Sequence, residues 1–230
     1  MRLIITGATG FVGNEVLRQA MRMPEITSIV AVARKPVQLD AAGPNYSKVK
    51  SVIVQDYDQY PDDVKKEFAG AAACIWTVAV TPSKSKSMQF ADVKRICQDF
   101  TMAGLQAMYE AGPAKPFRFM YMSGTAAPRD PNQKPGWFMP EYSQMRVRTR
   151  RSHGSRLRQA APGEIEACVA KPGLITNGTW KDTLMSAGLK VTGLAGSVRL
   201  SQVAAAMLRQ VVNGFEKEPL QNDDLVRLGS

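Results

Sequence analysis

The stretch LIITGATGFVG (residues 3–13) constrains the fold most, because three evenly spaced glycines follow directly on a run of branched apolar residues. The apolar run 2–6 predicts a buried strand, and the amphipathic segment 11–22 predicts a helix. Between them, Gly7, Gly10 and Gly13 allow a tight turn, close approach of the backbone to a pyrophosphate, and close packing of the helix on the strand. The pattern predicts a phosphate-binding turn at the start of a helix; the alternative is a tight turn without a ligand.

Short apolar runs and amphipathic segments alternate along the chain. The predicted strands are 2–6, 28–33, 50–56, 73–80, 117–123 and 166–173, and the predicted helices are 11–22, 61–69, 88–111, 141–160 and 201–213. This alternation predicts parallel strands joined by crossover helices. The expected fold class is α/β, a doubly wound, mostly parallel sheet of the Rossmann type. We expect one domain over residues 1–230, with a small substrate-side portion toward the C-terminus.

The chain has 230 residues, 44% hydrophobic, with a net charge of +10, which suggests an anionic ligand or partner. The arginine-rich run 146–158 invites a nucleic-acid reading, but it lacks interleaved aromatic residues, so a solvated helix face is favoured and no nucleic-acid partner is expected. We identify neither a leader peptide nor an apolar run of about 20 residues, so we expect a soluble, cytoplasmic protein without a membrane partner.

Three cysteines, Cys74, Cys97 and Cys168, are far apart in the sequence and lie in apolar surroundings. Metal sites and redox pairs need closely spaced ligands, so we expect no metal site. The three thiols are interpreted as buried packing residues.

Several segments together resemble the extended and atypical short-chain dehydrogenase/reductases, in particular short NmrA-like NAD(P)-binding proteins. The glycine spacing in TGATGFVG (6–13) is the strongest element of this resemblance. KPGLI (171–175) is similar to the family's Arg-Pro-Gly segment, YMSGT (121–125) to its fifth-strand end, and NDDLVRLG (222–229) to its C-terminal segment. The resemblance extends over nearly the whole chain and implies a nicotinamide cofactor.

The end of the second predicted strand indicates which cofactor to expect. NAD-specific enzymes usually carry an acidic residue there, whereas this chain has Arg34 and Lys35, which suit a 2′-phosphate. NADP(H) is therefore expected; the alternative is two exposed cations at the start of a loop. Asp56 and Tyr57 match the family's adenine-contact position. The complete set of predicted cofactor residues is Gly7, Thr9, Gly10, Phe11, Val12, Gly13, Arg34, Lys35, Asp56, Tyr57, Thr77, Val78, Ala79, Arg146, Pro172 and Gly173.

The resemblance also implies catalytic residues. The family uses a Tyr-x-x-x-Lys pair on the helix after the fifth strand, with a hydroxyl at the end of that strand. This chain offers Tyr142 as the acid, Arg146 four residues later, and Ser123 or Thr125 as the hydroxyl. Arginine can stabilise the tyrosine anion and bind ribose but cannot relay a proton. The alternative for Tyr142 is an aromatic side chain packed at the helix start.

A long irregular stretch, residues 124–141, follows the fifth predicted strand, at the sheet edge where open α/β sheets bind ligands. Trp137, Phe138 and Met139 in it, with Trp180 further on, are predicted to line a pocket for a largely apolar substrate. The alternative is a loop held to the surface by aromatic anchors.

The expected function is an NADP(H)-dependent atypical short-chain reductase acting on a carbonyl or enone of a small, largely apolar metabolite. One alternative is a non-redox isomerase, cyclase or dehydratase on the same fold, with a structural nucleotide or none. A second is a regulatory binding protein that senses NADP. Fold alone does not separate them, and the oligomeric state stays open.

Overall fold

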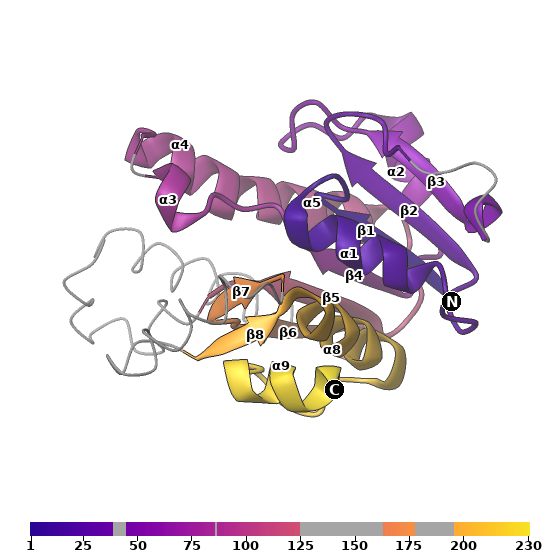
Figure 1. Cartoon of the computed structure of the whole chain (residues 1–230). Helices are drawn as coiled ribbons and strands as arrows, with labels where there is room; N and C mark the ends of the chain where they lie inside the picture. The colour runs from indigo at the N-terminus through magenta and orange to yellow at the C-terminus, as the bar shows by residue number, and fades with distance from the viewer. Residues whose placement is uncertain (39–44, 86, 125–162, 178–195) are drawn as a thin grey trace.

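The computed structural model describes residues 1–38, 45–85, 87–124, 163–177 and 196–230, and has a six-stranded parallel sheet at its centre (Figure 1). In spatial order β3-β2-β1-β4-β5-β6, its strands are β3 (Val49–Ile53), β2 (Ser28–Ala33), β1 (Arg2–Thr6), β4 (Ala73–Trp76), β5 (Phe117–Met122) and β6 (Ile165–Ala170). Two further short strands, β7 (Leu174–Thr176) and β8 (Ser197–Arg199), form a separate parallel pair. The predicted doubly wound α/β fold is confirmed.

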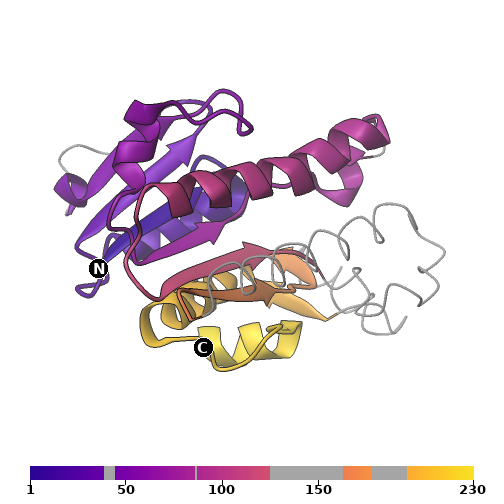
Figure 2. The same ribbon diagram turned by 180° about the vertical axis from the view of Figure 1, so that it is seen from behind.

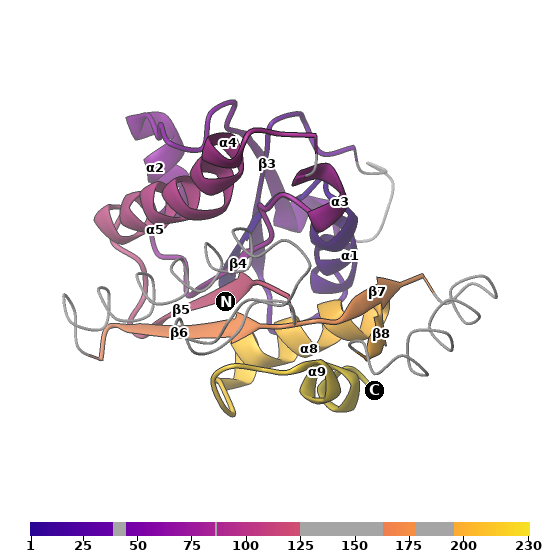
Figure 3. The same ribbon diagram turned by 90° about the vertical axis from the view of Figure 1, so that its left-hand side faces the viewer.

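Helices cover both faces of the sheet. One face carries α1 (Phe11–Ala20), α8 (Leu200–Asn213) and α9 (Asn222–Gly229), which lie in front in Figure 1. The other face carries α2 (Asp62–Phe68) and α5 (Phe100–Glu110), and Figure 2 shows α5 crossing it. Figure 3 shows the twisted sheet between these two helical layers. The shorter elements are η1 (Tyr46–Lys48), α3 (Pro82–Ser85), α4 (Phe90–Lys94) and the π-helical segment η2 (Arg95–Asp99).

The alternation of side chains along each strand explains the two cores. In β1, Leu3 and Ile5 pack against α1 and α8, whereas Ile4 packs on the opposite side with α2 and α5. All three are fully buried, as expected for a parallel strand covered on both faces. Among the described residues, Trp76 of β4 is the largest fully buried side chain, and it contacts α5 so closely that a Cβ at Gly104 would lie 2.4 Å from its ring.

Several predicted strands are too long, and the structure shows why. The predicted strand 73–80 ends at Trp76, because its neighbour β1 ends at Thr6 and the next residue, Gly7, turns away. The predicted strand 166–173 ends at Ala170, and Pro172 supplies no N–H for a ladder. Residues 171–173, which were predicted to belong to this strand, instead connect β6 to β7. The predicted strand 50–56 begins one residue earlier and ends at Ile53.

The predicted helix over 88–111 is a continuous run in which α4 and α5 are joined by η2. In this π-helical segment the Cys97 carbonyl accepts hydrogen bonds from the Thr101 hydroxyl at 3.2 Å and the Tyr121 hydroxyl at 3.4 Å. The sequence analysis did not predict η1, α3, η2, β7, β8 or α9. The predicted helix 141–160 lies outside the described residues.

All three cysteines are buried and free, as their interpretation as packing residues requires. Burial raises the pKa of Cys168 to about 12 and that of Cys74 well above its ordinary value. Within the described ranges, no cluster of His, Cys, Asp or Glu is arranged to hold a metal ion. A search of the same ranges finds no helix with the length and apolarity needed to span a membrane.

Candidate cofactor site

The glycine turn joins the carboxyl end of β1 to the start of α1, and its glycines have different structural roles. Gly7 has φ +70°, and its carbonyl accepts a hydrogen bond from the Gly10 amide at 2.8 Å. A Cβ on Gly13 would lie 2.2 Å from the Gly7 carbonyl oxygen, so the helix reaches the turn only without a side chain there. Gly7 and Gly13 are therefore required by the fold itself.

Gly10 differs, because its φ of −80° suits any residue and a Cβ there would meet only the Gly7 oxygen, at 3.0 Å. Thr9, Gly10 and Phe11 are exposed, with Phe11 54% exposed, whereas Val12 is buried. Gly10 caps α1 without a side-chain hydrogen bond, and the first turn carries no acidic residue. The start of α1 is thus an open helix N-terminus beside a glycine, which fits a pyrophosphate.

Thr77, just beyond β4, supports the turn from below. Its hydroxyl donates to the Thr6 carbonyl at 2.6 Å, and a Cβ on Gly7 would lie 2.7 Å from that hydroxyl oxygen. Val78 and Ala79 follow and are half-buried. These three residues were predicted to line the ribose side of a cofactor; the structure places Thr77 against the glycine turn.

Arg34 and Lys35 lie directly after β2, the strand next to β1, and both are exposed. The Ala8 amide donates to the Val32 carbonyl at 3.1 Å, so the end of β2 is tied to the glycine turn. Among the described residues, no acidic side chain forms an ion pair with either cation. The two positive charges therefore stand beside the turn and are available to an anionic group.

The loop after β3 contributes Asp56 and Tyr57, which the structure places in different surroundings. Tyr57 is buried beneath the turn: its hydroxyl donates to the Val32 carbonyl at 3.3 Å, and its ring meets Trp76 edge-on at 5.9 Å. Burial raises the pKa of Tyr57 to about 12, while the Gly7 backbone and the Arg34 charge act in the opposite direction. Tyr57 thus supports the floor of the site.

Asp56 faces outward and is engaged by Arg95 of η2. One terminal nitrogen of Arg95 lies 3.0 Å from Asp56 Oδ2 and 2.6 Å from Asp58 Oδ2. The guanidinium also lies over the Phe100 ring, 5.3 Å from its centre. Hydrogen bonding to Arg95 lowers the pKa of Asp58, and hydrogen bonding to Asp58 raises that of Arg95. We call Asp56, Asp58 and Arg95 the carboxylate bridge.

At the carboxyl ends of β5 and β6, Ser123 is 6% exposed and its amide donates to the Ala170 carbonyl at 2.8 Å. Pro172 is buried, and the Gly173 amide donates to the Asn222 side-chain oxygen at 2.9 Å. A Cβ on Gly173 would lie 1.8 Å from the Gly196 carbonyl oxygen. The Pro-Gly segment is thus held firmly against the start of α9.

The structure therefore brings the glycine turn, Arg34, Lys35, the Asp56 loop and Thr77 together around the carboxyl ends of β1 to β4, with Ser123 and Gly173 after β5 and β6. The other predicted site residues lie outside the described residues: Thr125, Tyr142, Arg146, Trp137, Phe138, Met139 and Trp180.

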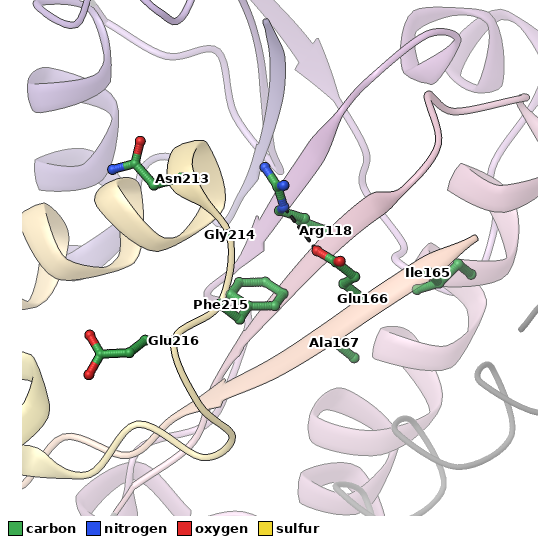
Figure 4. Close-up of a pocket in the computed structure, with 8 residues that line it drawn as sticks. All are labelled: Arg118, Ile165, Glu166, Ala167, Asn213, Gly214, Phe215 and Glu216. Carbon is green, nitrogen blue, oxygen red and sulfur yellow. Dashed lines mark hydrogen bonds and ion pairs between the residues drawn. The ribbon is translucent and has the colours of Figure 1, made fainter. Parts of the chain in front are cut away.

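A surface hollow of about 530 Å³ lies at the amino ends of β5 and β6, at the end of the sheet opposite the glycine turn (Figure 4). Arg118 and Glu166, near the amino ends of β5 and β6, face it together with Phe215 after α8. Arg118 pairs with Glu166 at 3.0 Å and donates to the carbonyls of Val211 and Val212. Because the hollow lies at the amino ends of the strands, it is separate from the candidate cofactor site at their carboxyl ends.

Sequence reasoning missed Arg95 and Asn222. Arg95 is one cation within a long amphipathic stretch. No nearby residue indicates that it pairs with Asp58, 37 positions earlier, and Asp56, 39 positions earlier. Asn222 lies in the NDDLVRLG segment noted for its resemblance, but its contact with Gly173 spans 49 positions. Neither contact has a signal in the spacing of nearby residues.

The reversal of strand order at β1, the glycine turn at its carboxyl end and the exposed start of α1 define a Rossmann-type nucleotide-binding protein. A family model described as NAD(P)H-binding matches residues 7–213. The chain belongs to this NAD(P)H-binding family, and the predicted resemblance to atypical short-chain dehydrogenase/reductases is confirmed at the level of family and fold.

Solved structures share this fold. A short-chain dehydrogenase/reductase from Brucella melitensis, described as a glucose/ribitol dehydrogenase, superposes with TM-score 0.70 at 15% identity, covering 97% of this chain and 95% of that one. MoeE5 in complex with UDP-glucuronic acid and NAD superposes with TM-score 0.66 at 15% identity, covering 95% and 74%.

A curated relative is similar over a shorter region. Leucinostatins biosynthesis cluster protein T of Purpureocillium lilacinum is 39% identical over 77 residues, which is 34% of this chain and 27% of that protein. The match thus spans about a quarter of that relative's length.

Proposed function

We propose that the chain binds NADP(H) at the glycine turn and reduces a carbonyl or enone of a small, largely apolar metabolite. The observation that carries the proposal is the open N-terminus of α1 at Gly10, with Arg34 and Lys35 beside it. The helix start suits the pyrophosphate, and the guanidinium of Arg34 suits a 2′-phosphate by charge and fork geometry. Membership of the NAD(P)H-binding family supports a nicotinamide cofactor.

When bound, NADPH supplies a hydride. The chain's own residues must then bind the substrate oxygen and deliver a proton to it. Ser123, buried at the carboxyl end of β5, is proposed to donate a hydrogen bond to that oxygen, with Thr125 as the alternative donor. Tyr142 is proposed to give its phenolic proton to the oxygen, and the Arg146 charge to stabilise the resulting phenolate and hold the ribose. Trp137, Phe138, Met139 and Trp180 are proposed to exclude water around an apolar substrate.

Calorimetric titration with NADPH and NADH tests the cofactor assignment. We expect the wild type to bind NADPH more tightly than NADH. Arg34→Ala should weaken NADPH binding by about 10- to 100-fold, the loss of a charge-assisted contact, and leave NADH binding nearly unchanged. Arg22→Ala, an exposed cation beyond the far end of α1, removes the same charge and should leave both affinities unchanged. Equal affinities in the wild type would overturn the NADP(H) assignment.

The second candidate is a non-redox isomerase or cyclase, and the arginine at position 146 favours it, because the resembled enzymes have lysine there. A panel of aromatic ketones, quinones and enones, followed by NADPH absorbance and product analysis, separates the two. A reductase consumes NADPH, and Tyr142→Phe should slow it by roughly 10²- to 10⁴-fold. Arg146→Lys should preserve or increase that activity. Conversion of a substrate without any fall in absorbance would favour the non-redox reaction.

A further inference from the structure

Folding stability does not explain why the carboxylate bridge is present. Asp56, Asp58 and Arg95 have side chains that are 44%, 32% and 50% exposed, and ion pairs this open to water contribute little to folding stability. The bridge is nevertheless a specific arrangement, because two carboxylates of one loop converge on a single nitrogen of Arg95. Its location suggests another role.

The bridge stands next to the cations proposed for the 2′-phosphate. Asp56 and Asp58 follow β3, Arg34 follows β2, and these strand ends are joined by the hydrogen bond from the Val54 amide to the Ala33 carbonyl at 3.0 Å. Tyr57, between the two carboxylates, is bonded to the end of β2. The three charges of the bridge thus lie at the edge where the adenosine half of a dinucleotide is expected.

The bridge also depends on the helical irregularity at η2. Arg95 is the first residue of the π-helical segment, and such segments often occur at functional sites. Bonds from Thr101 and Tyr121 to the Cys97 carbonyl anchor the segment, and the Phe100 ring supports the guanidinium. Arg95 is therefore held over the loop after β3.

We propose that Arg95 is a specificity-determining residue of the cofactor site: by offsetting one of the two negative charges of Asp56 and Asp58, it lets this end of the sheet accept a 2′-phosphate. This inference rests on the proposed function. With Arg95 the bridge has a net charge of −1, and without it −2, beside a group that is itself doubly negative. Coulomb repulsion over a short distance at the protein surface then penalises NADPH more than NADH, which lacks that phosphate.

Calorimetric titration of the full chain with NADPH and NADH at low salt tests this role. Arg95→Gln should weaken NADPH binding on the order of tenfold and NADH binding by about threefold or less. Arg95→Gln combined with Asp58→Asn restores the net charge of the bridge and should bring NADPH affinity back to within about twofold of wild type. Raising the ionic strength to about 0.5 M should remove most of the difference, because screening shortens the range of the repulsion.

The matched control is Lys65→Gln, which removes one positive charge and breaks an exposed ion pair to Glu110 of 2.7 Å between α2 and α5. It should leave the preference for NADPH unchanged. Equal losses for both cofactors in Arg95→Gln, no loss, or the same loss in Lys65→Gln would overturn the role of Arg95 while NADPH binding by the wild type still supports the proposed function. A wild type that binds neither cofactor would overturn both.

Discussion

At the scale of single residues, the same amino acid serves different purposes within one turn. Gly7 is required by its positive φ and Gly13 by its contact with the Gly7 carbonyl, so both belong to the fold. Gly10 has ordinary backbone angles and faces solvent, so its lack of a side chain matters to whatever approaches from outside. Stability and binding can therefore be separated by substitutions three residues apart.

Gly13→Ala should destabilise the protein by about 1–3 kcal/mol or more, because the new methyl group must displace backbone. Gly10→Ala should cost only about 0.5–1 kcal/mol, the expected difference at a helix N-cap, but should weaken NADPH binding by about tenfold. Urea unfolding and calorimetric titration of both variants measure the two effects. If Gly10→Ala binds NADPH as the wild type does, the turn does not hold the pyrophosphate.

Tyr57 makes stability depend on alkaline pH. Its pKa is raised to about 12 by burial, whereas an exposed tyrosine ionises near about 10, so the unfolded chain loses this proton first as pH rises. The contribution of Tyr57 to the free energy of unfolding should therefore be present in full below about pH 10 and be lost, by roughly 2–3 kcal/mol, as the pH rises toward 12.

Urea unfolding of the wild type and Tyr57→Phe between about pH 8 and pH 11.5 measures this contribution. The unfolding free energy of the wild type minus that of Tyr57→Phe should fall as pH rises, since the phenylalanine does not titrate. Tyr46→Phe is the control, because Tyr46 is 43% exposed. A difference that stays constant with pH would contradict the burial argument.

The glycine turn and the cations at positions 34 and 35 were predictable because each follows a strand within one stretch of sequence. The carboxylate bridge was not, since Arg95 meets Asp56 and Asp58 only after the chain has passed through α2 and β4. The burial of Tyr57 was equally hidden, because an aromatic residue after a strand looks the same whether it faces ligand or core. The spacing of nearby residues thus predicts groups that lie within one strand-to-helix connection, but not contacts between residues far apart in the sequence.

At the scale of elements, the sequence located most helices and strands but misjudged where strands end. The residues 78–80 are as apolar as those before them, yet they lie beyond the point where β1 turns, so they do not continue the ladder with β1. The parallel ladder stops where its neighbour stops, which apolar content does not report. In the π-helical segment, likewise, the Cys97 carbonyl accepts hydrogen bonds from the Thr101 and Tyr121 hydroxyls, and helical periodicity does not reveal these contacts.

The end of α8 depends on an arginine from a different element. Arg118 of β5 donates to the carbonyls of Val211 at 3.2 Å and Val212 at 3.0 Å, which no later helical residue satisfies. Arg118→Gln should therefore lower the unfolding free energy by about 1–2 kcal/mol.

Urea unfolding measures that loss, and Lys50→Gln, which breaks the exposed pair with Glu67, should cost less than about 1 kcal/mol. NADPH affinity should not change in Arg118→Gln, because the end of α8 lies at the sheet edge opposite the glycine turn. Loss of cofactor binding in a folded Arg118→Gln chain would contradict this separation of the two edges.

At the scale of the whole molecule, the three thiols report on global opening. Cys74, Cys97 and Cys168 are all buried, and the pKa values of Cys74 and Cys168 are raised by burial, so thiolate is scarce in the folded state. Ellman's reagent should react with almost no thiol in the native protein and with all three after unfolding in urea. Rapid reaction of one thiol under native conditions would show local opening around that cysteine.

The pairing of Leu220 with the end of β6 affects whether the sheet can pair with other chains. At its outer edge, β6 does not present bare backbone along its final residues: the Leu220 amide donates to the Val169 carbonyl at 2.9 Å, and the Leu220 carbonyl accepts from the Lys171 amide at 2.8 Å. A single residue before α9 thus occupies the place of a seventh strand. Because edge strands with unpaired backbone are templates for aggregation, this short clasp protects the margin of the sheet where a foreign strand would otherwise dock.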